Sequence, residues 1–350
     1  MEPDALVARA RTLLEIGRPA EAEAEARAAV GSDPANPAAH LVLSRAYSKQ
    51  KRHAEAIGAA QAAVALAPEL AEAHLALVGA LLGDGPSDDA VRAALVAVRL
   101  APHDWATHHA LGWALFELGS PWEKEARDAA ERANALAPSV PGTYGLLGLT
   151  LAACGRAREG RKVVREGLRI DPDDAHLHNN LAAIDLNHGV RLGRAARHLR
   201  TAAQVAPQDE VIHHNLDALV VRFATSLAWP TLLALVVLRV QVDDVVAWSA
   251  RATTGAALVG ALVLMTAWFG RQVPRGHTPW RSGSSGRMLL AATVTAGLVL
   301  YLALLAMVTA FGPPGWAGAS AEHIGTAVRY GLGALLIGGL VRRTPPRGRR

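Results

Sequence analysis

The sequence predicts an all-α protein in two parts, a right-handed superhelical solenoid followed by a four-helix transmembrane domain. Two observations lead to this fold class. Phrases that contain a proline recur about every 34 residues through residues 1–221, which indicates stacked repeats of one helical unit. Four long apolar stretches then occupy residues 222–350, and each is about long enough to cross a bilayer as a helix.

Three columns of residues define the repeat. Successive prolines lie 34, 34, 36, 34 and 35 residues apart: Pro34, Pro68, Pro102, Pro138, Pro172 and Pro207. A residue with a ring follows each proline after six positions: His40, His74, His108, Tyr144, His178 and His213. A leucine follows each ring after three: Leu43, Leu77, Leu111, Leu147, Leu181 and Leu216. Because the columns stay in register over six units, we treat the period as one structural unit.

Each unit is expected to form a pair of helices. Apolar residues recur at helical spacing, as in Ala73, Leu77 and Leu81, and small residues such as Ala56 and Ala90 suit a close crossing of two helices. Proline after the second helix ends it, because proline lacks an N–H and clashes with the preceding turn. One pair cannot bury its own apolar stripe, so the pairs are expected to stack into a solenoid with a concave groove.

This pattern resembles the tetratricopeptide repeat (TPR) family over about residues 3–221, as six repeats and a closing helix. It departs from the family pattern at the ring position, which is mostly His rather than Trp, and by small insertions near Ser120–Trp122 and Asn187–Val190. The resemblance implies that the concave groove binds a protein or peptide partner, whose identity the fold does not specify. The groove residues that it implies are Arg45, Lys49, Leu75, His109, Trp113, Phe116, Glu117, Asn179, Asn180, His214 and Asn215.

Two interpretations of the groove aromatics remain open. Trp113, Phe116 and His109 would form an aromatic patch that anchors a peptide, or Trp113 and Phe116 would simply pack between neighbouring repeats. The sequence shows no cluster of Lys, Asn and Arg of the kind that clamps the terminal carboxylate of a peptide in some family members. A partner recognised by its carboxyl terminus is therefore not indicated.

The sequence indicates no metal, cofactor or catalytic site. The histidines of the ring column lie about one repeat apart, too far to share an ion, so they are expected to pack between helices. One cysteine, Cys154, excludes an intramolecular disulfide. No P-loop, GxGxxG, HExxH or CxxC pattern is present, and we expect no enzymatic activity.

The charge is distributed unevenly between the two parts. The whole chain carries a net charge of +5, but residues 1–221 hold 23 basic and 28 acidic residues, whereas residues 222–350 hold 13 Arg and 3 acidic residues. A single basic domain that binds nucleic acid is therefore not expected. The chain has 32 Arg and 4 Lys, a composition typical of GC-rich, actinobacterial-like bacterial genomes.

Four apolar stretches follow the repeats. Their approximate bounds are 223–242, 252–269, 288–311 and 324–341. They could instead be core helices of a second soluble domain, but three acidic residues in this part would leave it too little polar surface. We therefore predict four membrane spans and a basic tail.

The loops predict one orientation. Residues 270–287 contain four Arg and no acidic residue, and five Arg follow the last span, whereas residues 312–323 contain no Lys or Arg. The positive-inside rule then places the 270–287 loop, the tail and the N-terminal repeats in the cytoplasm of a multi-pass plasma-membrane protein.

Together these features predict a membrane-anchored TPR scaffold or adaptor that binds a protein partner and touches membrane lipid. The alternative is a small transporter or channel subunit with the repeats as a regulatory domain. That alternative needs a polar pathway between the spans, for which Thr293, Thr295, Tyr301 and Thr309 are the candidates on the third span. The sequence is compatible with a homo-oligomer and does not name the partner.

Overall fold

The computed structural model describes residues 2–188 and 192–223, which are helical throughout apart from the turns. The chain divides into two compact units, Met1–Ile212 and His213–Arg350, and the account below concerns the first unless stated. Its helices are α1 (Pro3–Glu15), α2 (Pro19–Ser32), α3 (Pro37–Lys49), α4 (His53–Leu66), α5 (Ala71–Asp84), α6 (Asp88–Leu100), α7 (Trp105–Leu118), α8 (Glu123–Leu136), α9 (Pro141–Ala153), α10 (Ala157–Ile170), α11 (Ala175–Asn187) and α12 (Leu192–Val205). A further helix begins at residue 210 and runs to the end of the described region.

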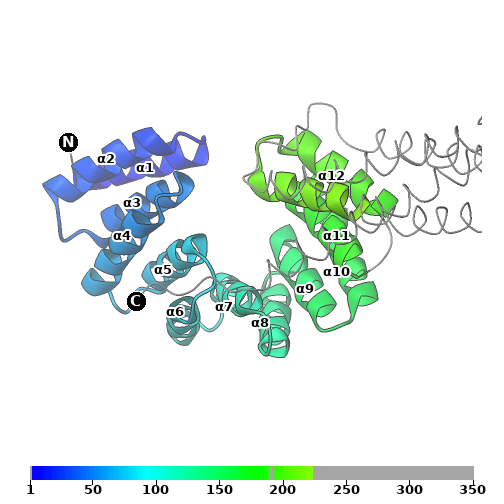
Figure 1. Ribbon diagram of the computed structural model, residues 1–350. Helices are drawn as coiled ribbons and strands as arrows, with labels where there is room; N and C mark the ends of the chain where they lie inside the picture. The colour runs from blue at the N-terminus through cyan, green and yellow to red at the C-terminus, as the bar shows by residue number, and fades with distance from the viewer. Residues whose placement is uncertain (1, 189–191, 224–350) are drawn as a thin grey trace, which may run out of the picture. The chain divides into compact units, whose positions relative to one another are not determined.

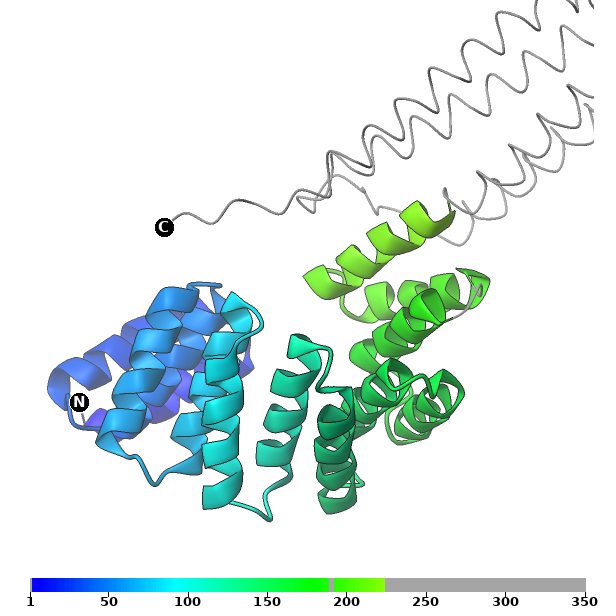
Figure 2. The ribbon, with the colours of Figure 1, turned by 60° about the horizontal axis from the view of Figure 1, so that its bottom comes forward.

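The helices form six consecutive pairs, α1 with α2 through α11 with α12, as the 34-residue period predicts (Figure 1). Each odd-numbered helix also contacts the odd-numbered helix of the next pair, whereas the even-numbered helices make no comparable contacts with one another. The odd-numbered helices therefore form the tighter, inner layer of a TPR-like solenoid, and the even-numbered helices form its outer layer (Figure 2). In the rest of the article, the inner surface is the surface that α1, α3, α5, α7, α9 and α11 share.

Buried residues on the second helix of each pair, most of them alanine or glycine, form part of the core of the array. Three columns on these helices are buried in every repeat: Ala22, Ala56, Ala90, Ala126, Gly160 and Ala195, then Ala26, Ala60, Ala94, Ala130, Val164 and Leu199, then Ala29, Ala63, Ala97, Ala133, Gly167 and Ala202. Alanine and glycine at these positions let the paired helices approach closely, because there is little side chain between the backbones.

Helices α9 and α10 approach each other closely at two glycines. A Cβ atom added to Gly160 would overlap the carbonyl oxygen of Gly148, and one added to Gly148 would overlap a methyl group of Val164. Both glycines are buried and helical, so they are needed here for space and not for backbone conformation.

The turn within each of the first five pairs has one residue in the left-handed region. These residues lie 34, 34, 34 and 36 positions apart: Gly17, Lys51, Gly85, Gly119 and Gly155. Four of the five are glycine, which adopts a positive φ without steric cost. Lys51, with a φ of 61°, is the exception among the described residues.

The ring column contributes a repeated hydrogen bond. In five repeats the side chain donates to the carbonyl oxygen of the proline six residues earlier, over distances of 2.8–3.0 Å. The donors are His40, His74, His108, Tyr144 and His178. His and Tyr both place a polar hydrogen at the end of a flat apolar ring, so either residue can fill the column.

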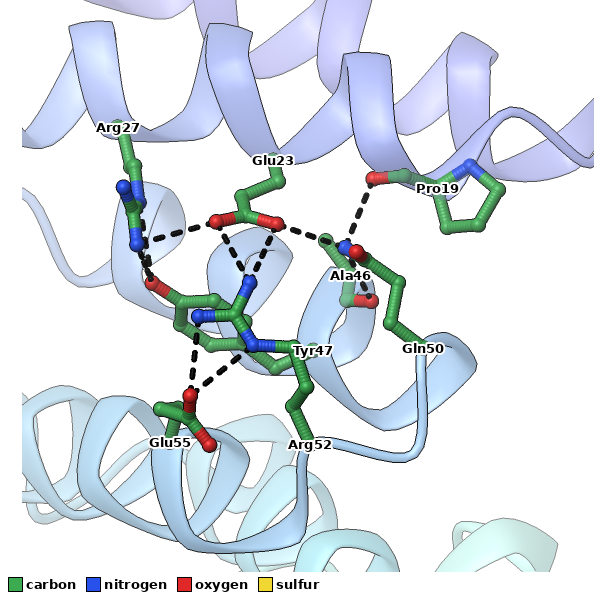
Figure 3. A network of polar contacts seen from close by, with 8 residues as sticks. All are labelled: Pro19, Glu23, Arg27, Ala46, Tyr47, Gln50, Arg52 and Glu55. Atoms are coloured by element: carbon green, nitrogen blue, oxygen red, sulfur yellow. Dashed lines mark hydrogen bonds and ion pairs between the residues drawn. The ribbon is translucent and has the colours of Figure 1, made fainter.

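A polar network joins the first two pairs (Figure 3). The carboxylate of Glu23 on α2 accepts hydrogen bonds from Gln50 at 2.8 Å and from Arg52 at 2.9 Å, and it forms an ion pair with Arg27 at 3.1 Å. Burial alone would raise the pKa of Glu23, but these hydrogen bonds and the two arginine charges outweigh it and lower the pKa. The hydroxyl of Tyr47 accepts from Arg27, and Arg52 lies 4.5 Å from the centre of the Tyr47 ring.

A buried ion pair joins the last two pairs. Arg161 on α10 donates to Asp185 on α11 at 2.5 Å, and the two side chains are 7% and 3% exposed. The pair crosses from one repeat to the next, so it fixes their register as well as satisfying both charges.

The four predicted spans lie outside the described residues, apart from Phe223. Within residues 2–188 and 192–223, no helix combines the length and the apolar character that crossing a bilayer requires.

Replacing Gly160 with alanine is expected to lower the free energy of unfolding by about 1–3 kcal/mol, because the new methyl group must displace the backbone of α9. The measurement is thermal or urea unfolding followed by circular dichroism. Gly58 on α4 is the matched control, because a Cβ there meets nothing within 4 Å. Gly58→Ala should raise stability by up to about 1 kcal/mol, and equal effects of the two changes would contradict the close-packing account.

Candidate functional site

The candidate site lies on the inner surface, where the helix pairs leave the first helix of each repeat partly uncovered. A row of rings runs along one face of α7 at spacings of four, four and three residues: Trp105, His109, Trp113 and Phe116. The ring centres are 5.7, 6.3 and 5.6 Å apart in that order, and each ring meets the next edge-to-face. Such edge-to-face contacts hold aromatic rings in fixed orientations.

Two rings of the row, those of Trp113 and Phe116, are partly buried in the core and partly exposed. Trp113 and Phe116 pack against a buried cluster that includes Leu146, Leu147 and Leu151 of α9, yet both rings keep part of their area exposed. The two interpretations of these residues are therefore compatible. One side of each ring joins neighbouring repeats, and the other side contributes to the inner surface.

His109 links the row to the next repeat. Its imidazole lies near the backbone of Gly142, close to the start of α9. Burial lowers the pKa of His109 from 6.5, and the nearby backbone of Gly142 opposes this shift only in part. At neutral pH the ring is therefore uncharged, which suits an apolar surface.

Few charges lie beside the row. Helix α9 contains no Asp, Glu, Lys, Arg or His, and α7 has Glu117 as its one acidic residue, on an exposed position. Glu72 of α5 is paired with Arg45 of α3 at 2.8 Å, and Lys49, also on α3, is exposed. Leu75 of α5 is partly exposed. The middle of the inner surface is therefore mainly apolar and aromatic.

The polar residues predicted for the far end of the groove occupy different environments. Asn179 of α11 is 5% exposed, so it offers little surface to a ligand. Asn180 lies against α9, since a Cβ on Gly145 would come within 2.7 Å of its amide nitrogen. His214 is exposed and Asn215 is partly exposed, and both belong to the second unit.

Trp105 is the member of the row that the carry-over from family positions omits. It stands four residues before His109, so the helical spacing of large rings alone could have identified it. In the part of the chain that the structure describes, His, Cys, Asp and Glu form no group of three that could hold a metal ion. The thiol of Cys154 donates to the carbonyl oxygen of Glu123 at 3.2 Å, and burial raises its pKa.

Comparisons with known proteins support the repeat assignment. Residues 7–71 match the family model described as tetratricopeptide repeat. These residues are TPR units. A comparison with curated proteins finds no match.

The described array also resembles solved structures. One is the Cut9 and Hcn1 hetero-tetramer of the APC/C, with a TM-score of 0.52 and 18% identity; the match covers 61% of this chain and 42% of that chain. PilF of Pseudomonas aeruginosa is similar with a TM-score of 0.46 and 17% identity, over 61% of this chain and 95% of PilF. The first likeness shows a helical solenoid. It is a likeness of fold alone, and this chain spans less than half of that relative.

The neutral state of His109 can be measured by NMR. We expect its imidazole to titrate with a midpoint below 6.5, and a His109→Gln variant identifies its resonances. A lowered pKa means that the unfolded chain binds the proton more tightly. His109 therefore contributes stability above pH 6.5, and this contribution is lost as the pH falls through the window below 6.5. A midpoint at or above 6.5 would contradict the buried, neutral ring.

Proposed function

We propose that this protein is a membrane-anchored TPR scaffold that binds a protein partner on the inner surface of its repeat array. The observation that carries the proposal is the row of rings on α7. Its members keep fixed edge-to-face geometry and retain exposed area. Rigid aromatic side chains that are half embedded in a core are typical anchors of protein interfaces.

The surroundings of the row support a partner segment with apolar side chains. Helix α9, on one side of α7 in the inner layer, is uncharged; on the other side Leu75 of α5 is partly exposed, and Glu72 of α5 is paired with Arg45. A strongly charged segment would lose its hydration against these apolar rings. A segment that inserts leucine or aromatic side chains gains buried apolar area instead.

The membrane part of the proposal comes from the sequence. Four apolar stretches between residues 223 and 341, with arginine-rich loops on alternate sides, support four spans with the repeats and the C-terminus in the cytoplasm of the cell. We propose no enzymatic role, because no set of nucleophile and base is recognisable in the sequence. The membrane helices then hold the array, and whatever it binds, at the plasma membrane.

Partner binding is tested by crosslinking and pull-down of the full-length protein from membranes. Trp113→Ala and Phe116→Ala, singly and together, should lose captured partners, because the exposed sides of these rings supply the anchoring contacts. Each ring also packs against α9, so helicity and the melting temperature are measured in parallel. Leu75→Glu is a second variant that leaves the core unchanged and adds a charge beside the row.

Trp122→Ala is the matched control, since Trp122 is 42% exposed and precedes α8, outside the inner surface. It should retain the partners. Retention of the same partners by Leu75→Glu and by a folded Trp113→Ala variant would disprove this surface as the binding site.

The orientation is tested by protease protection. In right-side-out vesicles the repeats should resist protease until the membrane is opened, and in inverted vesicles they should be cleaved at once. A cleavage site engineered into the 270–287 loop should behave like the repeats. Cleavage of the repeats on the surface of intact cells would overturn the proposed topology.

A further inference from the structure

The outer helices carry opposite charges at the two ends of the array. The outer helices of the first four pairs, α2, α4, α6 and α8, contain six Lys and Arg residues and ten Asp and Glu residues. The outer helices of the last two pairs, α10 and α12, contain eight Lys and Arg residues and two acidic residues. The net charge of residues 1–221 conceals this division.

The basic residues of α10 are aligned on one face. Arg158, Lys162, Arg165 and Arg169 follow one another at spacings of four, three and four residues, and all four are exposed. The opposite face of α10 is buried against α9 and α11 and includes Gly160, Val164 and Gly167. The packing of the helix therefore fixes the four basic side chains outward.

Helix α12 extends this charge. Arg194 and Arg197 are exposed on α12, and His198 of α12 stacks on His178 of α11 with ring centres 5.4 Å apart. The pKa of His198 is lowered to about 4, first by burial and then by the charge of His178, and Arg165 and Arg197 lower it further. Arg165 and Arg197 therefore lie within electrostatic reach of the same ring. We name Arg158, Lys162, Arg165, Arg169, Arg194 and Arg197 the basic face.

The charge of the basic face is not neutralised within the described residues. None of its five arginines forms an ion pair with an acidic residue there, and Lys162 has only a long contact of 3.9 Å with Glu166. The other acidic residue of α10, Glu159, is bound to Arg156 at 2.6 Å. The arginines of the N-terminal network differ, since Arg27 and Arg52 both pair with Glu23. The basic face therefore presents charge to an outside partner.

The position of the basic face in the sequence indicates the partner. Helix α12 ends at Val205, and the first predicted span begins about 18 residues later, at residue 223. With that span inserted, at most about 18 residues separate the last repeat from the cytoplasmic leaflet, whose anionic lipids attract Lys and Arg near the surface. Neither α10 nor α12 contains Phe, Trp or Tyr, so the basic face lacks the aromatic side chains on which nucleic-acid bases stack.

We infer that the basic face of α10 and α12 docks on the anionic phospholipid headgroups of the membrane that anchors the chain. This inference rests on the proposed membrane anchoring. Docking would fix the orientation of the last repeats against the bilayer and leave the inner surface of the earlier, acidic repeats free for the partner. Salt should weaken the contact, because the attraction extends only about a Debye length from the surface.

The experiment uses the full-length protein reconstituted into vesicles, labelled with a fluorophore on Cys154. Cys154 is the only cysteine in the chain and lies in the turn that leads to α10. Quenching by a headgroup-labelled lipid reports its distance from the membrane. Quenching should be strong in vesicles with about a third phosphatidylserine, weak in pure phosphatidylcholine, and reduced by high salt.

The test variant replaces Arg158, Arg165, Arg169 and Arg197 with glutamine. Each basic residue near an anionic surface strengthens binding by about fivefold, so the docking equilibrium should weaken by about two to three orders of magnitude. The control variant replaces Arg11, Arg99, Lys124 and Arg132 with glutamine. These four residues are exposed on the first four pairs, so the control has the same net charge and should keep the quenching.

Extraction with alkaline carbonate separates the two proposals. If all variants stay in the membrane and the phosphatidylserine-dependent quenching is equal in test and control, the basic face is not a docking surface. If the protein is extracted, the anchoring proposal fails.

Co-sedimentation of the full chain with the same vesicles then tests the docking surface by itself. Loss of co-sedimentation in the test variant alone would support the docking surface, and the absence of any co-sedimentation would overturn it. Tighter binding of duplex DNA or tRNA than of vesicles, lost in the test variant, would also overturn it.

Discussion

The close approach of the two helices in each pair is the constraint on which the array depends. Three columns on the second helices, mostly alanine and glycine, are buried in repeat after repeat, and between α9 and α10 there is no room for a methyl group on Gly148 or Gly160. Because the two helices of each pair pack closely, the first helix of one pair can contact the first helix of the next pair. The continuous inner layer, and any surface that it offers, follows from that contact.

The same constraint explains where large side chains occur. Most positions in the buried columns of the second helices hold alanine or glycine, whereas bulky rings lie on the first helices, as with Trp113 and Phe116 on α7. These rings gain stability from α9 on one side and keep exposed area on the other. A surface built in this way is held rigid by the core, which reduces the conformational entropy that a partner would have to offset on binding.

The 34-residue period predicts the helix pairs well, because six repeats share it. It cannot predict a feature that occurs in one repeat only. The helix pairs and the small residues at their crossings follow from registers that six units share. The sequence alone does not predict the hydrogen bond from the ring to the proline carbonyl, because this bond depends on the conformation of the residues between them. The buried ion pair of Arg161 and Asp185 joins one pair of neighbouring repeats, so no recurring column of the sequence predicts it. Asn179 shows the limit of carrying over groove positions from a family, because its exposure of 5% depends on its neighbours in this chain and not on its position in the repeat.

The bond from ring to proline also determines where the chain tolerates changes in length. The proline and the ring are six residues apart in every repeat, including the one that carries two extra residues near Ser120–Trp122. That insertion lies in the turn within a pair, between α7 and α8, where no ring-to-proline bond constrains the number of residues. Insertions, whether natural or engineered, should therefore be tolerated at the turns within the pairs. A tag, a loop or a whole domain fits between the two helices of a pair, whereas one residue added between pairs would disconnect a ring from its carbonyl.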